Sequence, residues 1–279
     1  MTSVVIIGGG PGGYEAALVA RQLGADVTVI DRDGLGGAAV LTDVVPSKGL
    51  ISVAEVLTRF RESARLGIDS ESLATVNLNA VNERLRRLAS QQSSDIHMRL
   101  DNEQITVIRG TATLTSDREV LVSSDAGEHS LSADIILIAT GAQPRVLATA
   151  IPDGRRILTW KQLYDLEELP QHLIVVGSGV TGAEFASAYH ALGSEVTLVS
   201  SREHVLPGQD SDAAQVIEEV FARRGITVVS KARAESVQAG SDGVRVQLAD
   251  GRVIEGSHCL MAVGSLPRSE EHTSELQSH

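Results

Sequence analysis

The chain has 279 residues, a formal net charge of −12 and 42% hydrophobic residues, a composition typical of globular proteins. The acidic balance argues against nucleic-acid binding and against an anionic-membrane surface, because both need a basic face. Cys259 is the single cysteine, which excludes an intrachain disulfide and a cysteine-built zinc site. The histidines show no ligand spacing with acids or thiols, so no metal is expected.

The N-terminal segment carries no targeting signal that we can identify. It opens directly into the apolar run Val4–Ile7, without the basic region of a signal peptide. No apolar run in the sequence reaches the length of about 18 residues that a membrane span needs. We therefore expect a cytoplasmic protein without a membrane span.

An internal repeat organises the predicted elements, because residues 4–31 match residues 173–200 in register. In each copy a buried apolar strand leads into a glycine-rich turn, a helix and a second β-branched strand. The repeated glycines are Gly8, Gly10 and Gly13 in the first copy and Gly177, Gly179 and Gly182 in the second. This order is typical of a dinucleotide-binding fold.

Further elements are predicted between and after the two copies. Helices are expected at residues 47–66 and 78–100, and strands at 105–108, 120–122 and 130–138. The segment 228–253 is expected to form short antiparallel strands. The predicted fold class is α/β, with two Rossmann-like dinucleotide-binding domains of the three-layer ββα type, parallel sheets and small antiparallel meanders.

Each glycine turn opens a helix whose free N–H groups and dipole favour a phosphate. Gly10 lets a pyrophosphate approach the backbone. Asp31 ends the second strand of the first copy, where a carboxylate accepts the hydroxyls of an adenosine ribose and repels a 2′-phosphate. Ser200 replaces this acid in the second copy and Arg202 follows. NADPH is therefore expected to be accepted, and NADH is not excluded. A plain surface charge remains the alternative for Arg202.

Four motifs in order resemble the pyridine nucleotide-disulfide oxidoreductase family, the flavoproteins that include lipoamide dehydrogenase and glutathione reductase. They are the first glycine turn with Asp31, the segment from Gly36-Gly37 to Pro46-Ser47-Lys48, Ala139-Thr140-Gly141, and the second glycine turn. The resemblance covers residues 1–267 and implies FAD on residues 1–150 and NAD(P)H on residues 151–267. The details of 36–41 and 158–164 are most similar to an actinobacterial NAD(P)H-quinone dehydrogenase branch.

The family's redox-active dithiol is missing from this sequence. Its two cysteine positions correspond to Ala39 and Val44, and a disulfide needs two thiols. The resemblance places Lys48 beside flavin N5, paired with Glu184, and these two are the predicted catalytic residues. The cofactor-binding residues that it implies, together with those argued above, are Gly8, Gly10, Pro11, Gly13, Asp31, Gly36, Gly37, Ala112, Thr140, Gly141, Gly177, Gly179, Val180, Gly182, Ser200, Arg202 and Gly264.

The implied function is a flavin-dependent NAD(P)H oxidoreductase that passes electrons from FAD to a quinone without a disulfide. The alternative is a non-catalytic nucleotide-binding fragment or a redox-sensing module. The family's later Gly-Asp segment and its dimer domain are missing, so we expect an incomplete FAD domain, weak FAD retention and an inactive fragment of a homodimeric enzyme. Residues 268–279 are expected to be a foreign, adapter-like, disordered tail.

Overall fold

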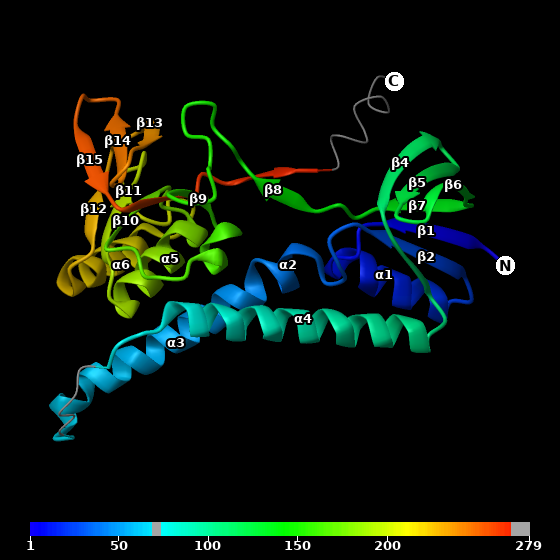
Figure 1. The fold of residues 1–279 in the computed structure, drawn as a ribbon, viewed down its shortest axis with the longest axis horizontal. Helices are drawn as coiled ribbons and strands as arrows, with labels where there is room; N and C mark the ends of the chain where they lie inside the picture. Colours follow the sequence, from blue (N-terminus) through cyan, green and yellow to red (C-terminus); the bar gives the residue numbers. More distant parts are fainter. Residues whose placement is uncertain (69–73, 269–279) are drawn as a thin grey trace. The chain divides into compact units, whose positions relative to one another are not determined.

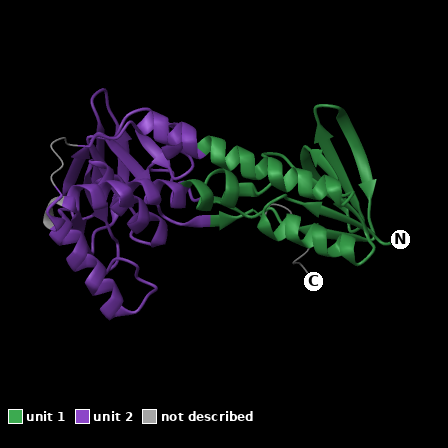
Figure 2. Cartoon of the chain, turned by 90° about the horizontal axis from the view of Figure 1, so that it is seen from below, with its two compact units in different colours: residues 1–46, 86–143, 266–279 green, residues 47–85, 144–265 purple. Residues whose placement is uncertain are grey.

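The computed structural model describes residues 1–68 and 74–268, which form two compact units (Figure 2). Unit 1 comprises residues 1–46, 86–143 and 266–279, and unit 2 comprises residues 47–85 and 144–265. These ranges differ from the predicted domains 1–150 and 151–267, because residues 47–85 and 144–150 belong to the second unit and residues 266 and 267 to the first. Of the predicted tail, Arg268 is described and the remainder lies outside the described residues.

A parallel four-stranded sheet forms the centre of unit 1 (Figure 1). The strands, in the order β3-β2-β1-β7, are β1 (Ser3–Ile7), β2 (Asp26–Asp31), β3 (Thr106–Arg109) and β7 (Ile135–Ile138). Helix α1 (Pro11–Gln22) connects β1 to β2. Pro11 occupies its first turn, where the N–H group that proline lacks would have no helical partner.

A separate layer covers each face of this sheet. Successive side chains of a strand point to opposite faces, so each strand contributes apolar residues to both. One face packs on α1 and on the end of α4 (Leu78–Asn102), through Val4, Ile6, Val27, Val29, Ala17, Leu18 and Leu100. The other face packs on an antiparallel meander of β4 (Thr111–Ser116), β5 (Glu119–Ser124) and β6 (Gly127–Ser132). Its buried residues are Val5, Ile7, Ile30, Ala112, Val120, Val122 and Ala133. Unit 1 is therefore a three-layer ββα sandwich.

Unit 2 repeats this arrangement. Its parallel sheet has the order β12-β11-β10-β16-β9, with β9 (Ile157–Thr159), β10 (His172–Val176), β11 (Glu195–Val199), β12 (Thr227–Val229) and β16 (His258–Met261). Helix α5 (Val180–Leu192) connects β10 to β11, and α6 (Ser211–Arg224) connects β11 to β12. The meander β13 (Ala234–Ala239), β14 (Val244–Leu248) and β15 (Val253–Gly256) packs on the sheet through Val237, Val246, Ile174 and Cys259.

The remaining elements are short or connect these layers. Helix α2 (Gly37–Leu41) precedes α3 (Val44–Glu62), which continues into the 3₁₀ turn η1 (Ser63–Leu66), and η2 (Gln162–Asp165) follows β9. Strands β8 (Ala142–Pro144) and β17 (Ser265–Pro267) pair with each other. Among the described residues, no helix is both long and apolar enough to cross a membrane.

The predicted helices and strands are present, and three of the differences from the prediction concern strand pairing or a long helix. The expected strand at 130–138 is two strands, because β6 and β7 belong to different sheets. Residues 227–229 form β12, which pairs parallel to β11 rather than joining the antiparallel meander. Helix α6 was not predicted, although Asp210 caps its first turn and Gly225 ends it.

Candidate dinucleotide sites and the Lys48–Glu184 pair

The first glycine turn is shaped by close approaches of backbone. Gly8 has φ +109°, and a Cβ at this position would overlap the carbonyl oxygen of Ala139. A Cβ at Gly13 would overlap the carbonyl oxygen of Gly8. At Gly10, by contrast, the nearest heavy atom to an added Cβ would be Gly37 Cα at 3.9 Å. The turn therefore needs glycine at two positions for packing and leaves open space at the third.

Asp31 lies at the carboxyl end of β2, as predicted, and its carboxylate is already hydrogen-bonded. Oδ2 accepts the N–H of Gly9 at 2.6 Å, while Oδ1 accepts those of Asp33 at 2.8 Å and Gly34 at 2.6 Å. The side chain thus fixes the glycine turn to the loop after β2. Two carboxylate oxygens offer about four acceptor positions, so Oδ2 retains capacity for a ribose hydroxyl.

A cavity of about 80 Å³ lies at this end of the sheet. It brings together four predicted residues, Gly8, Asp31, Ala112 and Thr140. The hydroxyl of Thr140 is buried without a hydrogen-bond partner, as is that of Thr42 elsewhere in unit 1. Buried hydroxyls normally have partners. A polar ligand group at Thr140 would supply one, and Asp31 could accept a hydroxyl, so these side chains suit the ribose hydroxyls of a dinucleotide.

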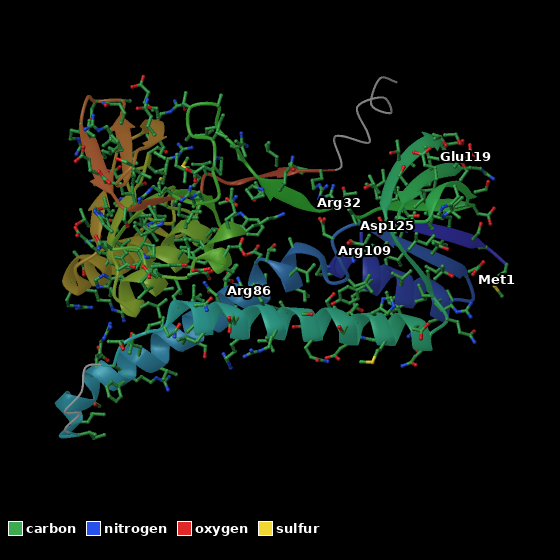
Figure 3. The ribbon with its side chains drawn as sticks, in the orientation of Figure 1. Met1, Arg32, Arg86, Arg109, Glu119 and Asp125 are labelled. Carbon is green, nitrogen blue, oxygen red and sulfur yellow. The ribbon has the colours of Figure 1, made fainter. Side chains whose placement is uncertain are left out.

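Basic residues flank the same edge of the sheet. Arg32 follows β2, and Arg109 ends β3 in register with Asp31 (Figure 3). Arg268 also lines the cavity, and its backbone N–H donates to the carbonyl of Gly141 at 2.8 Å. Arg268, expected as the first residue of the tail, therefore contacts the predicted Ala139-Thr140-Gly141 motif.

The second glycine turn repeats the geometry of the first. Gly177 has φ +112°, and a Cβ there would overlap the carbonyl oxygen of Ala262. A Cβ at Gly182 would overlap the carbonyl oxygen of Gly177. An added Cβ at Gly179, the N-cap of α5, would meet no heavy atom within 4 Å. The N-terminus of α5 therefore has open space where a phosphate could bind.

A cavity of about 170 Å³ adjoins this turn. It brings together Gly179, Val180 and Gly264 with Trp160 and Thr181. Three predicted residues from two segments that are far apart in the sequence thus line one cavity. Their arrangement fits the pyrophosphate and nicotinamide end of a second dinucleotide.

Ser200 follows β11, but its side chain is fully buried and occupied. Its Oγ lies 2.7 Å from Ser178 Oγ and accepts the N–H of Arg202 at 3.1 Å. The hydroxyl therefore shapes the loop after β11. Contact of Ser200 or of the exposed Arg202 with a 2′-phosphate stays a prediction.

The loop after β11 is also held from α6, by a residue that sequence reasoning missed. Glu218 accepts the N–H of Val205 at 2.6 Å and lies 3.2 Å from the Nδ1 of His204. The 13-residue separation of Glu218 from Val205 gives no local pattern, and finding this contact requires knowing that α6 exists.

Lys48 and Glu184 form an ion pair within unit 2. Lys48 lies on α3 and Glu184 on α5, and Nζ is 2.7 and 2.8 Å from the two carboxylate oxygens. The side chains are 55% and 33% exposed, so solvent screens the pair and its contribution to stability is about 0–1 kcal/mol. The structure brings together the two predicted catalytic residues, whose role beside a flavin stays a prediction.

The cysteine chemistry agrees with the absence of a dithiol. Cys259 is fully buried in β16, and this burial raises the pKa of its thiol. Ala39 and Val44, where the resemblance predicts the family's two cysteines, carry no thiol and cannot form a disulfide. Among the described residues, no group of three or more His, Cys, Asp or Glu could hold a metal ion.

The fold and its paired glycine turns define a class: proteins with two dinucleotide-binding units of the ββα type. The chain belongs to the pyridine nucleotide-disulphide oxidoreductase family, which it matches over residues 2–278. FAD and NAD(P)H are the cofactors of this family. The predicted family and fold class are therefore confirmed.

Individual proteins of known name are also similar to this chain in sequence or structure. The NAD(P)H dehydrogenase (quinone) of Mycobacterium tuberculosis is 50% identical over 96% of this chain and 57% of its own length. The dihydrolipoyl dehydrogenase of Chlorobaculum parvum is 36% identical over 94% of this chain and 56% of its own length. The crystal structure of LpdA from M. tuberculosis has a TM-score of 0.92 at 48% identity, over 99% of this chain and 61% of that one. The chain thus spans less than two thirds of the relatives it matches.

Proposed function

We propose that this chain is the two-dinucleotide part of a flavin-dependent NAD(P)H oxidoreductase whose electron acceptor is a quinone. The observation that carries the proposal is the duplicated glycine turn, in which Gly10 and Gly179 leave open space at a helix N-terminus while their neighbours are closely packed. The chain belongs to an oxidoreductase family, and its relatives include both quinone and dihydrolipoyl dehydrogenases.

The lack of a second thiol favours the quinone over a disulfide or dithiol partner. A dithiol relay forms and breaks an S–S bond between two cysteines. This chain has one thiol, buried in β16 of unit 2. A quinone instead takes electrons directly, so the reaction NAD(P)H + H⁺ + quinone → NAD(P)⁺ + quinol balances without a protein disulfide.

In this proposal unit 1 binds FAD. The N–H groups at the start of α1 would hold its pyrophosphate, Asp31 its ribose, and Thr140 a further polar group. FAD, when bound, would accept a hydride from NAD(P)H and pass electrons to the acceptor. Gly36, with φ +90°, is the N-cap of α2, and Gly37, with φ +55°, is its first residue, so both positions favour glycine where α2 begins.

Unit 2 would bind NAD(P)H. The start of α5 would hold the pyrophosphate, with Val180 and Gly264 lining the cavity beside it. No acid ends β11, so a 2′-phosphate would not be repelled there, and Arg202 would attract it. Lys48 would stabilise negative charge on the reduced flavin, with Glu184 holding the ammonium group in position.

Three further features belong to the proposal. We propose a cytoplasmic protein, full-length homologues that form homodimers, and a small-molecule acceptor rather than a macromolecular one.

The second candidate function is a nucleotide-binding module without turnover. The open space at Gly10 and Gly179 that carries the proposal serves nucleotide binding alone equally well.

A flavin titration tests the proposal. The purified chain is mixed with FAD and binding is followed by flavin absorbance and fluorescence, after which NADPH or NADH is added without oxygen. Binding of FAD followed by bleaching of its absorbance supports the oxidoreductase. Because weak retention of FAD is expected, FAD is added in excess, and bound flavin that both NADPH and NADH leave oxidised supports the non-catalytic module and contradicts the proposal.

A further inference from the structure

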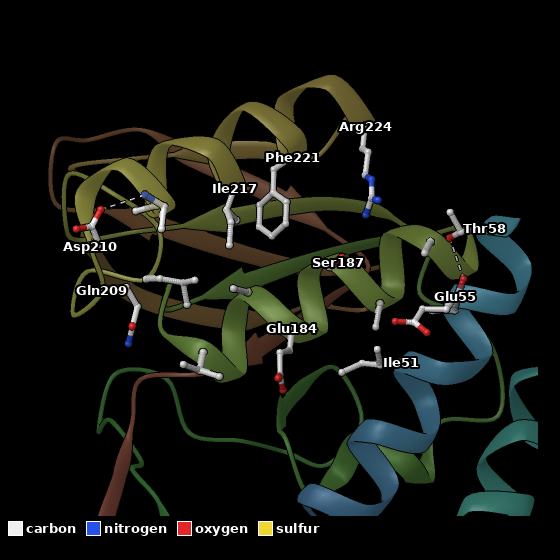
Figure 4. A pocket seen from close by; sticks show the side chains of 18 of the residues that line it. Ile51, Glu55, Thr58, Glu184, Ser187, Gln209, Asp210, Ile217, Phe221 and Arg224 are labelled. Carbon is white, nitrogen blue, oxygen red and sulfur yellow. Dashed lines mark hydrogen bonds between the residues drawn. The ribbon is translucent and has the colours of Figure 1, made fainter. Parts of the chain in front are cut away.

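Helices α3, α5 and α6 enclose a groove of about 840 Å³ within unit 2 (Figure 4). Its lining is mainly apolar and includes Ile51, Ala183, Leu206, Ile217 and Phe221. The volume is within the range of small-molecule sites, about 300–1,000 Å³. A groove of this size and composition suits an elongated apolar molecule.

Charged side chains of both signs surround the groove. Glu55 and Asp210 face it together with Arg59 and Arg224, so their formal charges cancel. The carboxylate of Asp210 also caps α6 by accepting backbone N–H groups of its first turn. This balance gives no preference for an anion or a cation, and a neutral ligand avoids the cost of burying an unpaired charge.

Glu184 connects the groove to the site described above. It lines the groove, and its carboxylate holds the ammonium group of Lys48 at 2.7 Å. The charge of Glu184 is therefore matched by Lys48 rather than offered to a ligand. The ion pair that the proposed function assigns to the redox centre thus lies against the apolar groove.

We infer that this groove binds the apolar tail of the quinone acceptor, with the quinone ring beside Glu184. The inference rests on the proposed function, because the pair Lys48–Glu184 marks the redox centre only if FAD binds as proposed. The quinone gains two electrons that NAD(P)H loses, and two protons, one from NAD(P)H and one from water, to give the quinol.

Quinone binding to the complete 279-residue chain tests this inference directly. The probes are 2,3-dimethoxy-5-methyl-1,4-benzoquinone carrying a decyl tail and the same quinone without the tail, measured by equilibrium dialysis. Burial of several methylenes should make the tailed quinone bind at least about tenfold more tightly.

A matched pair of substitutions on α6 separates the groove from the rest of the surface. Ile217 is half-buried and lines the groove, whereas its neighbour Val216 is 58% exposed and does not. Ile217→Asp should weaken binding of the tailed quinone about tenfold or more, because it puts a charge beside the tail. Val216→Asp makes a similar change in the same helix and should leave binding unchanged.

The outcomes distinguish this inference from the proposed function. Equal affinity for the two quinones, or equal effects of the two substitutions, would overturn the groove assignment even if NADPH reduces bound flavin. Self-association of the chain that Ile217→Asp abolishes, without quinone binding, would also overturn it by assigning the groove to a second copy. A third outcome is that the tailed quinone binds as expected but NADPH does not reduce the flavin. This result would refute the proposed function, and with it the assignment of the bound quinone as the electron acceptor.

Discussion

Gly179 and Gly182 provide a test in which folding and nucleotide binding respond to different substitutions. Both glycines lie at the start of α5, three residues apart. A methyl group at Gly182 would overlap the carbonyl oxygen of Gly177, whereas one at Gly179 would meet no heavy atom within 4 Å. Gly182→Ala should therefore destabilise unit 2, and Gly179→Ala should act on the ligand.

The magnitudes follow from these surroundings. Because the overlap at Gly182 is with backbone, the turn or helix must shift, which costs about 1–3 kcal/mol or more. Gly179 has φ −68° and ψ −176°, which alanine also adopts, so its replacement costs only the difference between two N-cap residues, below about 1 kcal/mol. Its methyl would displace a phosphate from the N–H groups, and one lost charge-assisted hydrogen bond lowers affinity about tenfold or more.

Two measurements on each variant complete the test. Trp160 is the single tryptophan, is buried in unit 2, and lines the cavity beside Gly179, so its fluorescence reports urea unfolding of this unit. NADPH binding is followed by the fluorescence of the nicotinamide. The reasoning is refuted if Gly179→Ala unfolds at as low a urea concentration as Gly182→Ala, or if it binds NADPH as tightly as the wild type.

Three further predictions concern stability and reactivity. In α1, Gly12→Ala should stabilise the folded chain by up to about 1 kcal/mol, because an added Cβ has no neighbour within 4 Å. Gly13→Ala should destabilise it, because the added Cβ would overlap the carbonyl oxygen of Gly8. Urea unfolding followed by far-UV circular dichroism compares the two variants, and equal effects would contradict the packing argument. Burial, and secondarily the charge of Arg156, lowers the pKa of His258 below its usual 6.5, so the folded state favours the neutral ring. The stability of the folded chain should therefore fall as the pH drops below about 6.5, and it should fall less in His258→Asn. Melting temperatures between pH 5 and 8 test this. Cys259, whose thiol pKa burial raises, should resist iodoacetamide at pH 8 in the folded chain and react in urea, and rapid labelling without urea would contradict its buried position.

The glycine turns could be predicted from sequence because their determinants are local. A buried strand, three glycines and a helix within a short segment are sufficient to specify the turn, and both copies adopt it. The pairing of short strands could not be predicted in the same way. Residues 227–229 read as an apolar run, and nothing local shows that β12 pairs with β11 rather than with the meander.

The same limit explains the expected strand at 130–138. Its two halves lie in different sheets, and the break falls at Asp134, whose carboxylate accepts the backbone N–H of Ser3 at 2.9 Å. That partner is distant in sequence, so the alternation of apolar residues gives no sign of it. The division into units has a similar origin, since Asn82 of α4 donates to the carbonyl of Leu166 at 2.8 Å.

The loop after β11 shows how a site residue can be identified by position and still act indirectly. Ser200 stands where Asp31 stands in unit 1, but its hydroxyl is used between Ser178 and the N–H of Arg202. The backbone of Arg202 is also held by the N–H of Lys231, which donates to its carbonyl at 2.9 Å. The position of Ser200 in the sequence predicts contact with the ligand. Its hydrogen bonds show instead that its hydroxyl holds the backbone of Arg202 in place.

This arrangement bears on the choice between NADH and NADPH. Glu203 is the acid nearest in sequence to Arg202, and a free carboxylate there would oppose a 2′-phosphate. Glu203 is instead paired with Lys231 at 2.7 Å, and the hydrogen bond from Lys231 lowers the pKa of Glu203. Because this pair carries no net charge, Glu203 does not offset the positive charge of Arg202. A preference for NADPH would therefore depend on Arg202 directly and on Ser178 and Ser200 through the loop that positions it.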